Sequence, residues 1–224
     1  MKRYNKHPWL ETFPIQSNSK KLIIGTHPPM PYRGCLQFYY GNSYEFWRFM
    51  ELTFQDFQFF NFEMKPDLEL ILNWSENKEF SITDMIQHTK ADNSFSVDSD
   101  IIIDDYKFQL NQFLFDWLKE SKVNKIYFTS FSEGKSAYDL FRKWVKMHFN
   151  KRLPKGRDII NQNNNHKLKI FDREFELIML YSPSPAARRG IPRSQPYIKW
   201  LKDNPTIENP IDEFRVYWYK KYLL

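Results

Sequence analysis

The chain from Lys21 to Met50 has the sequence KLIIGTHPPMPYRGCLQFYYGNSYEFWRFM, and its order of apolar, polar and aromatic residues sets the architecture. A short apolar run, Leu22 to Ile24, lies between two lysines and a glycine, and this pattern predicts a buried strand. The polar, proline-rich turn Gly25–Pro29 follows directly, and an aromatic segment follows the turn. Because α/β proteins place their chemistry at the ends of buried strands, this turn is the first candidate for a functional site.

Strand and helix patterns continue along the rest of the chain. Short apolar runs predict strands at residues 80–85, 125–128, 167–171 and 175–181, the last two as a hairpin or as an approach to the last core strand. Helical spacing of apolar residues predicts helices at 44–60, continuing into a buried loop, and at 66–74, 105–120, 135–149 and 197–201. We expect a long functional loop at 87–100 and a solvated excursion at 150–166. The strand, turn and helix at 125–149 fit a parallel sheet.

Length and composition limit the classes of protein to consider. The chain has 224 residues, of which 42% are hydrophobic, and these values predict a single domain spanning residues 1–224. Its formal net charge is +6 and its pI is near 9.2, which gives weak support to a polyanionic partner.

Cysteine and histidine usage gives no sign of a disulfide framework or a metal centre. Cys35 is the only cysteine, which suits a reducing cytoplasm. The five histidines lack the close pairing of metal motifs, so we expect no metal. The N-terminus lacks an apolar signal-peptide core, and no window approaches the roughly 20 apolar residues of a membrane span. We therefore expect a cytoplasmic protein that does not engage a membrane.

Polar turns follow three of the predicted strands. They are His27-Pro28-Pro29, Thr83-Asp84, and the segment Ser182-Pro183-Ser184-Pro185. In a parallel sheet the carboxyl ends of the strands meet at one edge and build a crevice. We expect these three turns to converge there.

Four segments resemble, in the same order, the motifs of the uracil-DNA glycosylase superfamily. The turn at 25–29, GTHPP, resembles Gly-x-(Asp/Asn)-Pro-(Tyr/Gly), and YYGNSYEFW at 39–47 resembles Tyr-Tyr-x-x-Pro-x-Asn-x-Phe-Trp with one residue fewer. ITDMI at 82–86 and DSDI at 98–101 resemble the middle segment of the hypoxanthine branch. YSPSPAA at 181–187 resembles the closing motif, Pro-Ser-x-Ser-Pro-Ala. The chain is most similar to the mismatch-specific and hypoxanthine-DNA glycosylase-like branches.

The resemblance implies a three-layer α/β/α fold with a central, mainly parallel sheet of four to five strands. It implies a cofactor-free DNA base-excision repair glycosylase that hydrolyses the N-glycosidic bond of a flipped deaminated base, uracil or hypoxanthine. Its partner would be DNA containing a damaged or mismatched base, and no obligate protein partner is implied. A flipped base is held by aromatic faces and identified by hydrogen bonds to its edge.

The resemblance also assigns roles to individual residues. The catalytic candidates are His27, Asn42 and Glu45. The base-binding candidates are Thr26, Tyr39, Tyr40, Asp84 and Ser130. The DNA-binding candidates, on the loop that would enter the minor groove, are Ser182, Ser184, Arg188, Arg189 and Arg193.

His27 departs from the family pattern, which has Asp or Asn at this position to place the attacking water. A neutral imidazole can orient or deprotonate water, whereas a protonated one would oppose the cationic sugar. His27 is therefore catalytic, contacts DNA only, or marks a chain that lost or moved its chemistry. The third reading makes the protein a catalytically inactive DNA- or nucleotide-binding protein on the glycosylase scaffold. In the hypoxanthine branch an Asn beside the Phe-Trp pair acts instead, and Asn42 and Glu45 are the nearest matches.

Each candidate also has a structural alternative. Asp84 is equally suited to capping the polar segment that follows it. The hydroxyls of Ser182 and Ser184 fit ordinary turns, and Arg188 and Arg189 fit a solvated surface. The resemblance implies Tyr40, or failing that Tyr39 or Phe38, as the stacking platform, and of the aromatic residues in this segment we expect one to face a ligand, with Phe46 and Trp47 in the core.

Overall fold

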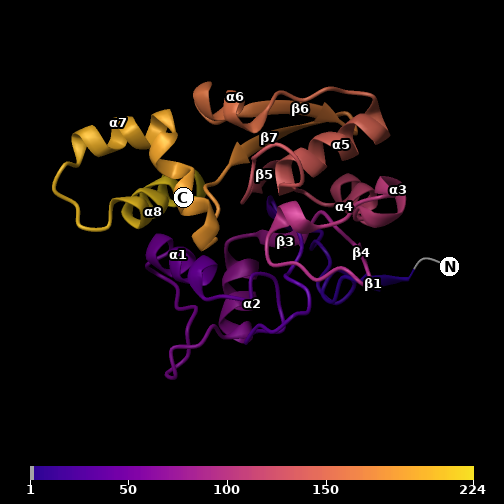
Figure 1. Ribbon diagram of the computed structural model, residues 1–224, viewed down its shortest axis with the longest axis horizontal. Helices are drawn as coiled ribbons and strands as arrows, with labels where there is room; N and C mark the ends of the chain where they lie inside the picture. Colours follow the sequence, from indigo (N-terminus) through magenta and orange to yellow (C-terminus); the bar gives the residue numbers. More distant parts are fainter. Residues whose placement is uncertain (1–2) are drawn as a thin grey trace.

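A central five-stranded sheet runs through the computed structural model, which describes residues 3–224 (Figure 1). Its strands lie in the spatial order β3, β2, β5, β7, β6. Their bounds are Phe80–Asp84 for β3, Lys21–Gly25 for β2, Lys125–Phe128 for β5, Arg173–Met179 for β7 and His166–Ile170 for β6. Within this sheet four strands are parallel, and β6 is antiparallel through its hairpin with β7. The predicted mainly parallel sheet is confirmed.

The register of the parallel strands brings their carboxyl ends together. Gly25 of β2 lies opposite Asp84 of β3, and Ile24 lies opposite Phe128 of β5. Phe128 in turn lies opposite Met179 of β7. The polar turns that follow these strands therefore share one edge of the sheet, as predicted.

Helices cover both faces of the sheet (Figure 1). α1 (Glu45–Thr53), α2 (Leu68–Asn77) and α8 (Pro210–Leu223) lie on one face, and α3 (Tyr106–Gln109), α4 (Leu114–Glu120) and α5 (Ala137–Phe149) on the other. Aromatic packing explains the two layers. Trp74 of α2 stacks on Phe80, with ring centroids 4.9 Å apart, while Tyr138 of α5 packs on Phe128 at 5.0 Å. The predicted three-layer α/β/α arrangement is confirmed.

Side-chain caps mark the starts of α2 and α5. The Asp67 carboxylate accepts hydrogen bonds from the backbone N–H groups of Glu69 and Leu70 at the start of α2. The Ser136 hydroxyl accepts one from Asp139 N–H at the start of α5. Such caps satisfy N–H groups that have no partner within the helix. The capping of α5 fixes its N-terminus beside the end of β5.

The prediction of one helix at 105–120 is wrong, because two buried amides break it into α3 and α4. The Gln109 side-chain oxygen accepts from the backbone N–H groups of Asp104 and Asp105, at 2.8 and 2.9 Å. The Asn111 amide donates to the backbone oxygen of Asp84 at 3.0 Å. Side-chain to backbone bonds of this kind compete with the helical ladder. Asn111 thereby holds the end of β3.

The prediction of a solvated excursion at 150–166 is also wrong. This segment contains α6 (Gly156–Asn161), which buries Ile159 and Ile160. The buried Asn164 side chain exchanges two hydrogen bonds of 2.9 Å with the backbone of Met179. The Asn164 amide thereby takes the place of a neighbouring strand for Met179, at a point just before β6 begins.

The loop expected at 87–100 contains more order than predicted. β4 (His88–Lys90) pairs antiparallel with β1 (Tyr4–Lys6), and a 3₁₀ turn, η1, covers Asp98–Asp100. This small second sheet was not predicted. It carries the N-terminal residues to the carboxyl-end edge of the central sheet.

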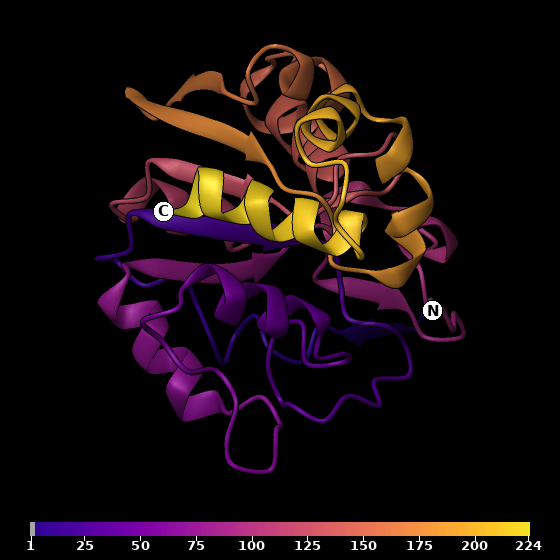
Figure 2. The ribbon, with the colours of Figure 1, turned by 90° about the vertical axis from the view of Figure 1, so that its left-hand side faces the viewer.

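The chain after β7 forms two 3₁₀ turns, η2 (Pro185–Arg189) and η3 (Ile191–Arg193), and then α7 (Gln195–Asp203) and α8. Figure 2 shows this loop on the side toward which the strands of the central sheet point. Across residues 3–224, no helix combines the length and the apolar character that crossing a membrane would require.

Candidate functional site

Six polar side chains gather where β2, β3 and β5 end, and we call them the strand-end cluster. They are His7, Thr26, His27, Asp84, Asp98 and Ser130. Four of them, Thr26, His27, Asp84 and Ser130, are residues that the sequence predicted for the site. His7 was missed, and Asp98 was noted only as part of a motif.

Gly25 allows the side chains at this edge to approach the backbone closely. A Cβ atom at Gly25 would lie 2.2 Å from Asp84 Oδ1 and 2.7 Å from the Tyr40 hydroxyl oxygen. Real Cβ atoms do not tolerate such distances, so only glycine fits between these two side chains. The carboxyl group of Asp84 and the phenol of Tyr40 therefore meet over the end of β2.

His7 holds Asp84 from the N-terminal side. Its Nδ1 accepts the backbone N–H of Trp9 at 3.0 Å, so the ring proton resides on Nε2, which donates to Asp84 Oδ2 at 2.9 Å. Burial lowers the pKa of His7 to about 3, so the ring is neutral at pH 7. Oδ2 of Asp84 is thus occupied by His7, and Oδ1 faces the end of β2.

His27 presents one unused nitrogen. Its Nδ1 donates to the backbone oxygen of Pro28 at 2.6 Å, which leaves a lone pair on Nε2. Nε2 is buried and, among the described residues, has no hydrogen-bond partner. Burial, with a smaller contribution from His7, lowers the pKa of His27 to about 3. A neutral imidazole with a free, buried acceptor is able to orient a water molecule and take its proton.

Asp98 completes the cluster from the loop after β4. The Thr26 hydroxyl donates to Asp98 Oδ2 at 2.8 Å, and Ser130 donates to the same oxygen at a longer 3.5 Å. The Ser130 oxygen also accepts the N–H of Ala137 at 2.9 Å, which ties the cluster to the start of α5. The only signal for Asp98 in the sequence was its place in the DSDI motif.

Both carboxyl groups of the cluster have raised pKa values. Burial raises the pKa of Asp84 to about 7. Burial and then repulsion from Asp84 raise the pKa of Asp98 to about 6, against the opposing hydrogen bond from Thr26. Two carboxyl groups that titrate near neutrality are able to exchange a proton with a bound ligand.

The two neighbouring tyrosines have different environments. Tyr39 is 1% exposed, and its hydroxyl donates to the backbone oxygen of Phe13 at 3.3 Å, so it packs as a core residue. Tyr40 is only partly buried, stacks on Phe46 at 3.9 Å, and its hydroxyl lies 2.8 Å from that of Thr129. Tyr40 is therefore the more accessible of the two tyrosines.

Asn42 and Glu45 lie apart from the cluster's hydrogen bonds. The Asn42 side chain is exposed and, in the described part of the chain, makes no hydrogen bond. Glu45 is the first residue of α1, and its charge acts on Arg215 of α8. The structure thus joins neither residue to His27 by a direct contact.

The Ser182–Arg193 loop is fastened to α8 by Arg215. This arginine is fully buried and donates to the backbone oxygen of Ser184 at 3.0 Å and to Asp212 at 3.3 Å. Asp212 also pairs with Arg188 at 3.2 Å. Sequence reasoning missed Arg215, because a basic residue in the tail FRVYWYKK gives no sign of burial.

The other loop cations are available to a ligand. Arg189 and Arg193 are exposed, and among residues 3–224 neither forms an ion pair. The hydroxyl of Ser182 accepts the N–H of Ser184 at 3.2 Å, an ordinary turn contact. Arg188, by contrast, already forms an ion pair with Asp212 of α8.

Two comparisons with known proteins give no match: no protein-family model and no curated protein is similar to the chain. Among solved structures, the solution NMR structure of a candidate uracil DNA glycosylase from Methanosarcina acetivorans is similar. It matches over 93% of this chain and 95% of that one, with 17% sequence identity and a TM-score of 0.48. A similarity of this size assigns no activity to the chain.

Proposed function

We propose that the protein is a DNA base-excision repair glycosylase, which hydrolyses the N-glycosidic bond of a flipped deaminated base such as uracil or hypoxanthine. The observation that carries this proposal is the free, buried Nε2 of a neutral His27, whose ring interacts with the Asp84 carboxyl group at the strand-end edge. The order of the four motifs supports the same activity.

Hydrolysis of the bond to the base passes through a cationic, oxocarbenium-like sugar. The electrons of the C1′–N bond leave with the base, and the oxygen of a water molecule then bonds to C1′. His27 Nε2 would hold this water and accept its proton. An ionised Asp98 would stabilise the cation, and the neutral imidazole rings of His7 and His27 add no opposing charge.

Asp84 is placed to identify the base and to assist its departure. Its Oδ1 lies free of the His7 bond, and a carboxylate there would accept the ring N–H that uracil and hypoxanthine both present. In its protonated form, which its raised pKa makes accessible near pH 7, the same group would donate a proton to the leaving base. Tyr40 would supply the aromatic face.

Entry of a base requires movement at this edge, because Asp84 is 6% and His27 9% exposed. Phe95 packs edge-on against His27 at 5.6 Å, and its backbone pairs with Met30 through two bonds of 3.0 Å. Opening this pairing would uncover His27. The loop that carries Phe95 also carries Asp98, so closure over a base would restore the complete cluster.

A cleavage assay tests the proposal. Labelled single- and double-stranded oligonucleotides carrying uracil, hypoxanthine, xanthine or a G·T mismatch are incubated with the protein and then with alkali, which breaks abasic sites. We expect excision of at least one base and a loss of 100-fold or more, typical of a lost general base, in His27→Ala. His88→Ala, at a partly exposed histidine outside the cluster, serves as the matched control. Absence of excision from every substrate would overturn the proposal.

The second candidate is a catalytically inactive DNA- or nucleotide-binding protein on the same scaffold. The observation in its favour is that Asn42 and Glu45, the alternative catalytic positions, make no direct contact with His27, while Arg189 and Arg193 remain free for phosphates. Salt-dependent DNA binding without excision, unchanged in His27→Ala, would favour this candidate.

A further inference from the structure

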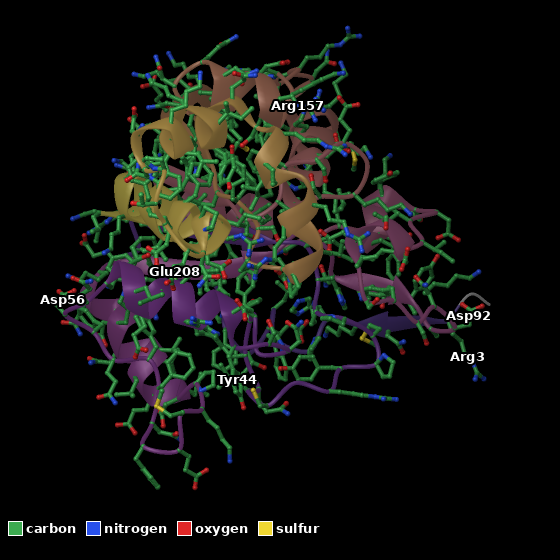
Figure 3. All side chains as sticks on the ribbon, turned by 60° about the vertical axis from the view of Figure 1, so that its left-hand side comes forward. Arg3, Tyr44, Asp56, Asp92, Arg157 and Glu208 are labelled. Carbon is green, nitrogen blue, oxygen red and sulfur yellow. The ribbon has the colours of Figure 1, made fainter. Side chains whose placement is uncertain are left out.

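Positive charge is concentrated in one segment of the chain. Lys135 to Arg157 contains eight Lys and Arg residues and one acidic residue, Asp139. This surplus of seven exceeds the +6 of the whole chain, so the remainder is slightly acidic. The segment comprises α5, the loop after it and the start of α6. Arg157, at its end, lies on the opposite side of the molecule from Tyr44 (Figure 3).

A cavity of about 570 Å³ lies along this segment, within the size range of ligand sites. Four cationic side chains line it: Arg142, Lys143, Lys146 and Arg152. Apolar surface comes from Tyr106 of α3, Met147 and Leu153. Met147 is 41% exposed, which leaves an apolar side chain uncovered among cations.

Most of the positive charge at the cavity has no carboxylate partner. Asp139 is shared by Arg142 at 2.9 Å and Lys143 at 3.1 Å. Lys146 contacts only the neutral amide of Asn150, and Arg152 forms no ion pair within residues 3–224. Four cations against one carboxylate give the cavity lining a surplus of three positive charges, and Lys151 and Arg157 add to them nearby. Glu133, which pairs with Lys155, offsets part of the charge of Arg142 and Arg157.

We propose that this surface, the α5 surface (residues 135–157 with the cavity), binds a single strand of DNA. Its cations would hold successive phosphates, and the cavity would hold an unstacked base against Met147 and Tyr106. Proteins that bind single strands combine a basic groove with apolar or aromatic faces in this way. A paired duplex presents phosphates but no free base for the cavity. The inference rests on the proposed function for its choice of DNA as the ligand.

The position of α5 connects the two sites. Its first residue, Ala137, donates its N–H to Ser130 of the strand-end cluster. From there the 13 residues of α5 extend about 20 Å, at about 1.5 Å per residue, past the cavity. A strand that leaves the cluster along α5 would therefore meet the four cations in turn.

The test is fluorescence anisotropy with an undamaged, labelled oligothymidylate and with a duplex of the same length. The triple variant Lys146→Gln, Arg152→Gln, Arg157→Gln is compared with a control triple, Lys119→Gln, Lys122→Gln, Lys202→Gln. All six side chains are exposed and form no ion pair in the part of the chain that the structure describes. Both triples remove the same charge.

We expect the α5 triple to bind the single strand at least tenfold more weakly than the wild type. The slope of log affinity against log salt should fall by about 2, at about 0.7 per phosphate contact. The control triple should change both values little. Equal effects of the two triples, no effect of the α5 triple, or an equal loss on the duplex would each overturn the inference.

The binding assay does not depend on excision, so the two proposals can fail separately. If the wild type excises no base but the α5 triple loses strand binding, the α5 surface is upheld and the glycosylase proposal is overturned. Excision that proceeds normally, with strand binding unchanged in the α5 triple, would do the reverse.

Discussion

His7 Nε2 lies 2.9 Å from Asp84 Oδ2, although 77 residues separate the two along the chain. The pairing of β1 with β4 brings them together, and the backbone N–H of His7 donates to Gln87 at 2.7 Å. The contact fixes which oxygen of Asp84 is free. His7 is therefore a positioning residue for the carboxyl group that would meet the base.

We expect His7→Phe to destabilise the protein and to impair excision. The substitution leaves the Trp9 N–H and Asp84 Oδ2 without their partner in a buried site, which costs about 2–4 kcal/mol of unfolding free energy. Urea unfolding gives the stability change, and single-turnover excision gives the rate.

His88→Phe is the control for this change. His88 is partly exposed and stacks on Phe108 at 4.3 Å, outside the strand-end cluster. We therefore expect His88→Phe to lower the unfolding free energy by less than about 1 kcal/mol. Equal stability losses in the two variants would contradict the role given to His7.

The architecture followed from sequence where local signals were strong. The apolar run Leu22–Ile24 predicted β2, and the helical spacing of apolar residues predicted helices at 66–74 and 135–149 that overlap α2 and α5, because burial patterns are local properties. Buried amides were not foreseen. Gln109 and Asn111 end or start helices through partners that only the folded chain supplies.

The candidate site, like the fold, was predictable only in part from the sequence. Asp84 ends β3, and Thr26, His27 and Ser130 lie just after β2 and β5, so the parallel sheet brings all four to one edge. His7 could not be placed there, because the strand that precedes it, β1, is three residues long and pairs outside the central sheet. The roles of these residues remain predictions.

Arg215→Met should loosen the Ser182–Arg193 loop. Arg215 is fully buried and bridges Ser184 and Asp212, so its loss removes the donor to the Ser184 carbonyl and leaves the partly exposed Asp212 paired with Arg188 alone. We expect the unfolding free energy to fall by about 1.5–3 kcal/mol, the range for hydrogen bonds that involve a charged group. Limited proteolysis should then cut within the loop before the rest of the protein unfolds.

Arg188→Met supplies the comparison, because Arg188 pairs with the same Asp212 but is 44% exposed. An exposed pair contributes at most about 1 kcal/mol, so this variant should resist proteolysis like the wild type. If both variants were cut alike, the buried bond to Ser184 would not be what holds the loop.

Asp84 should make the unfolding free energy fall as pH rises. Burial raises its pKa from 3.8 to about 7, so between about pH 4 and 7 the folded protein holds a proton that the unfolded chain has released. The contribution of Asp84 to the unfolding free energy is therefore at its full value below about pH 4 and decreases as the pH rises toward 7. Relative to Asp84→Asn, the wild type should lose up to about 1.4 kcal/mol per pH unit in this range.

His27 provides a control of opposite sign. Its pKa falls from 6.5 to about 3 on folding, so between those values the unfolded chain binds a proton that the folded one lacks. Relative to His27→Phe, the wild type should therefore gain stability as pH rises from about 3 to 6.5. Urea unfolding at pH steps from 4 to 7.5 measures both differences. An Asp84 difference that stays flat across this range would mean that the buried carboxyl group keeps its ordinary pKa, and proton donation from Asp84 to the leaving base would then lose its physical basis.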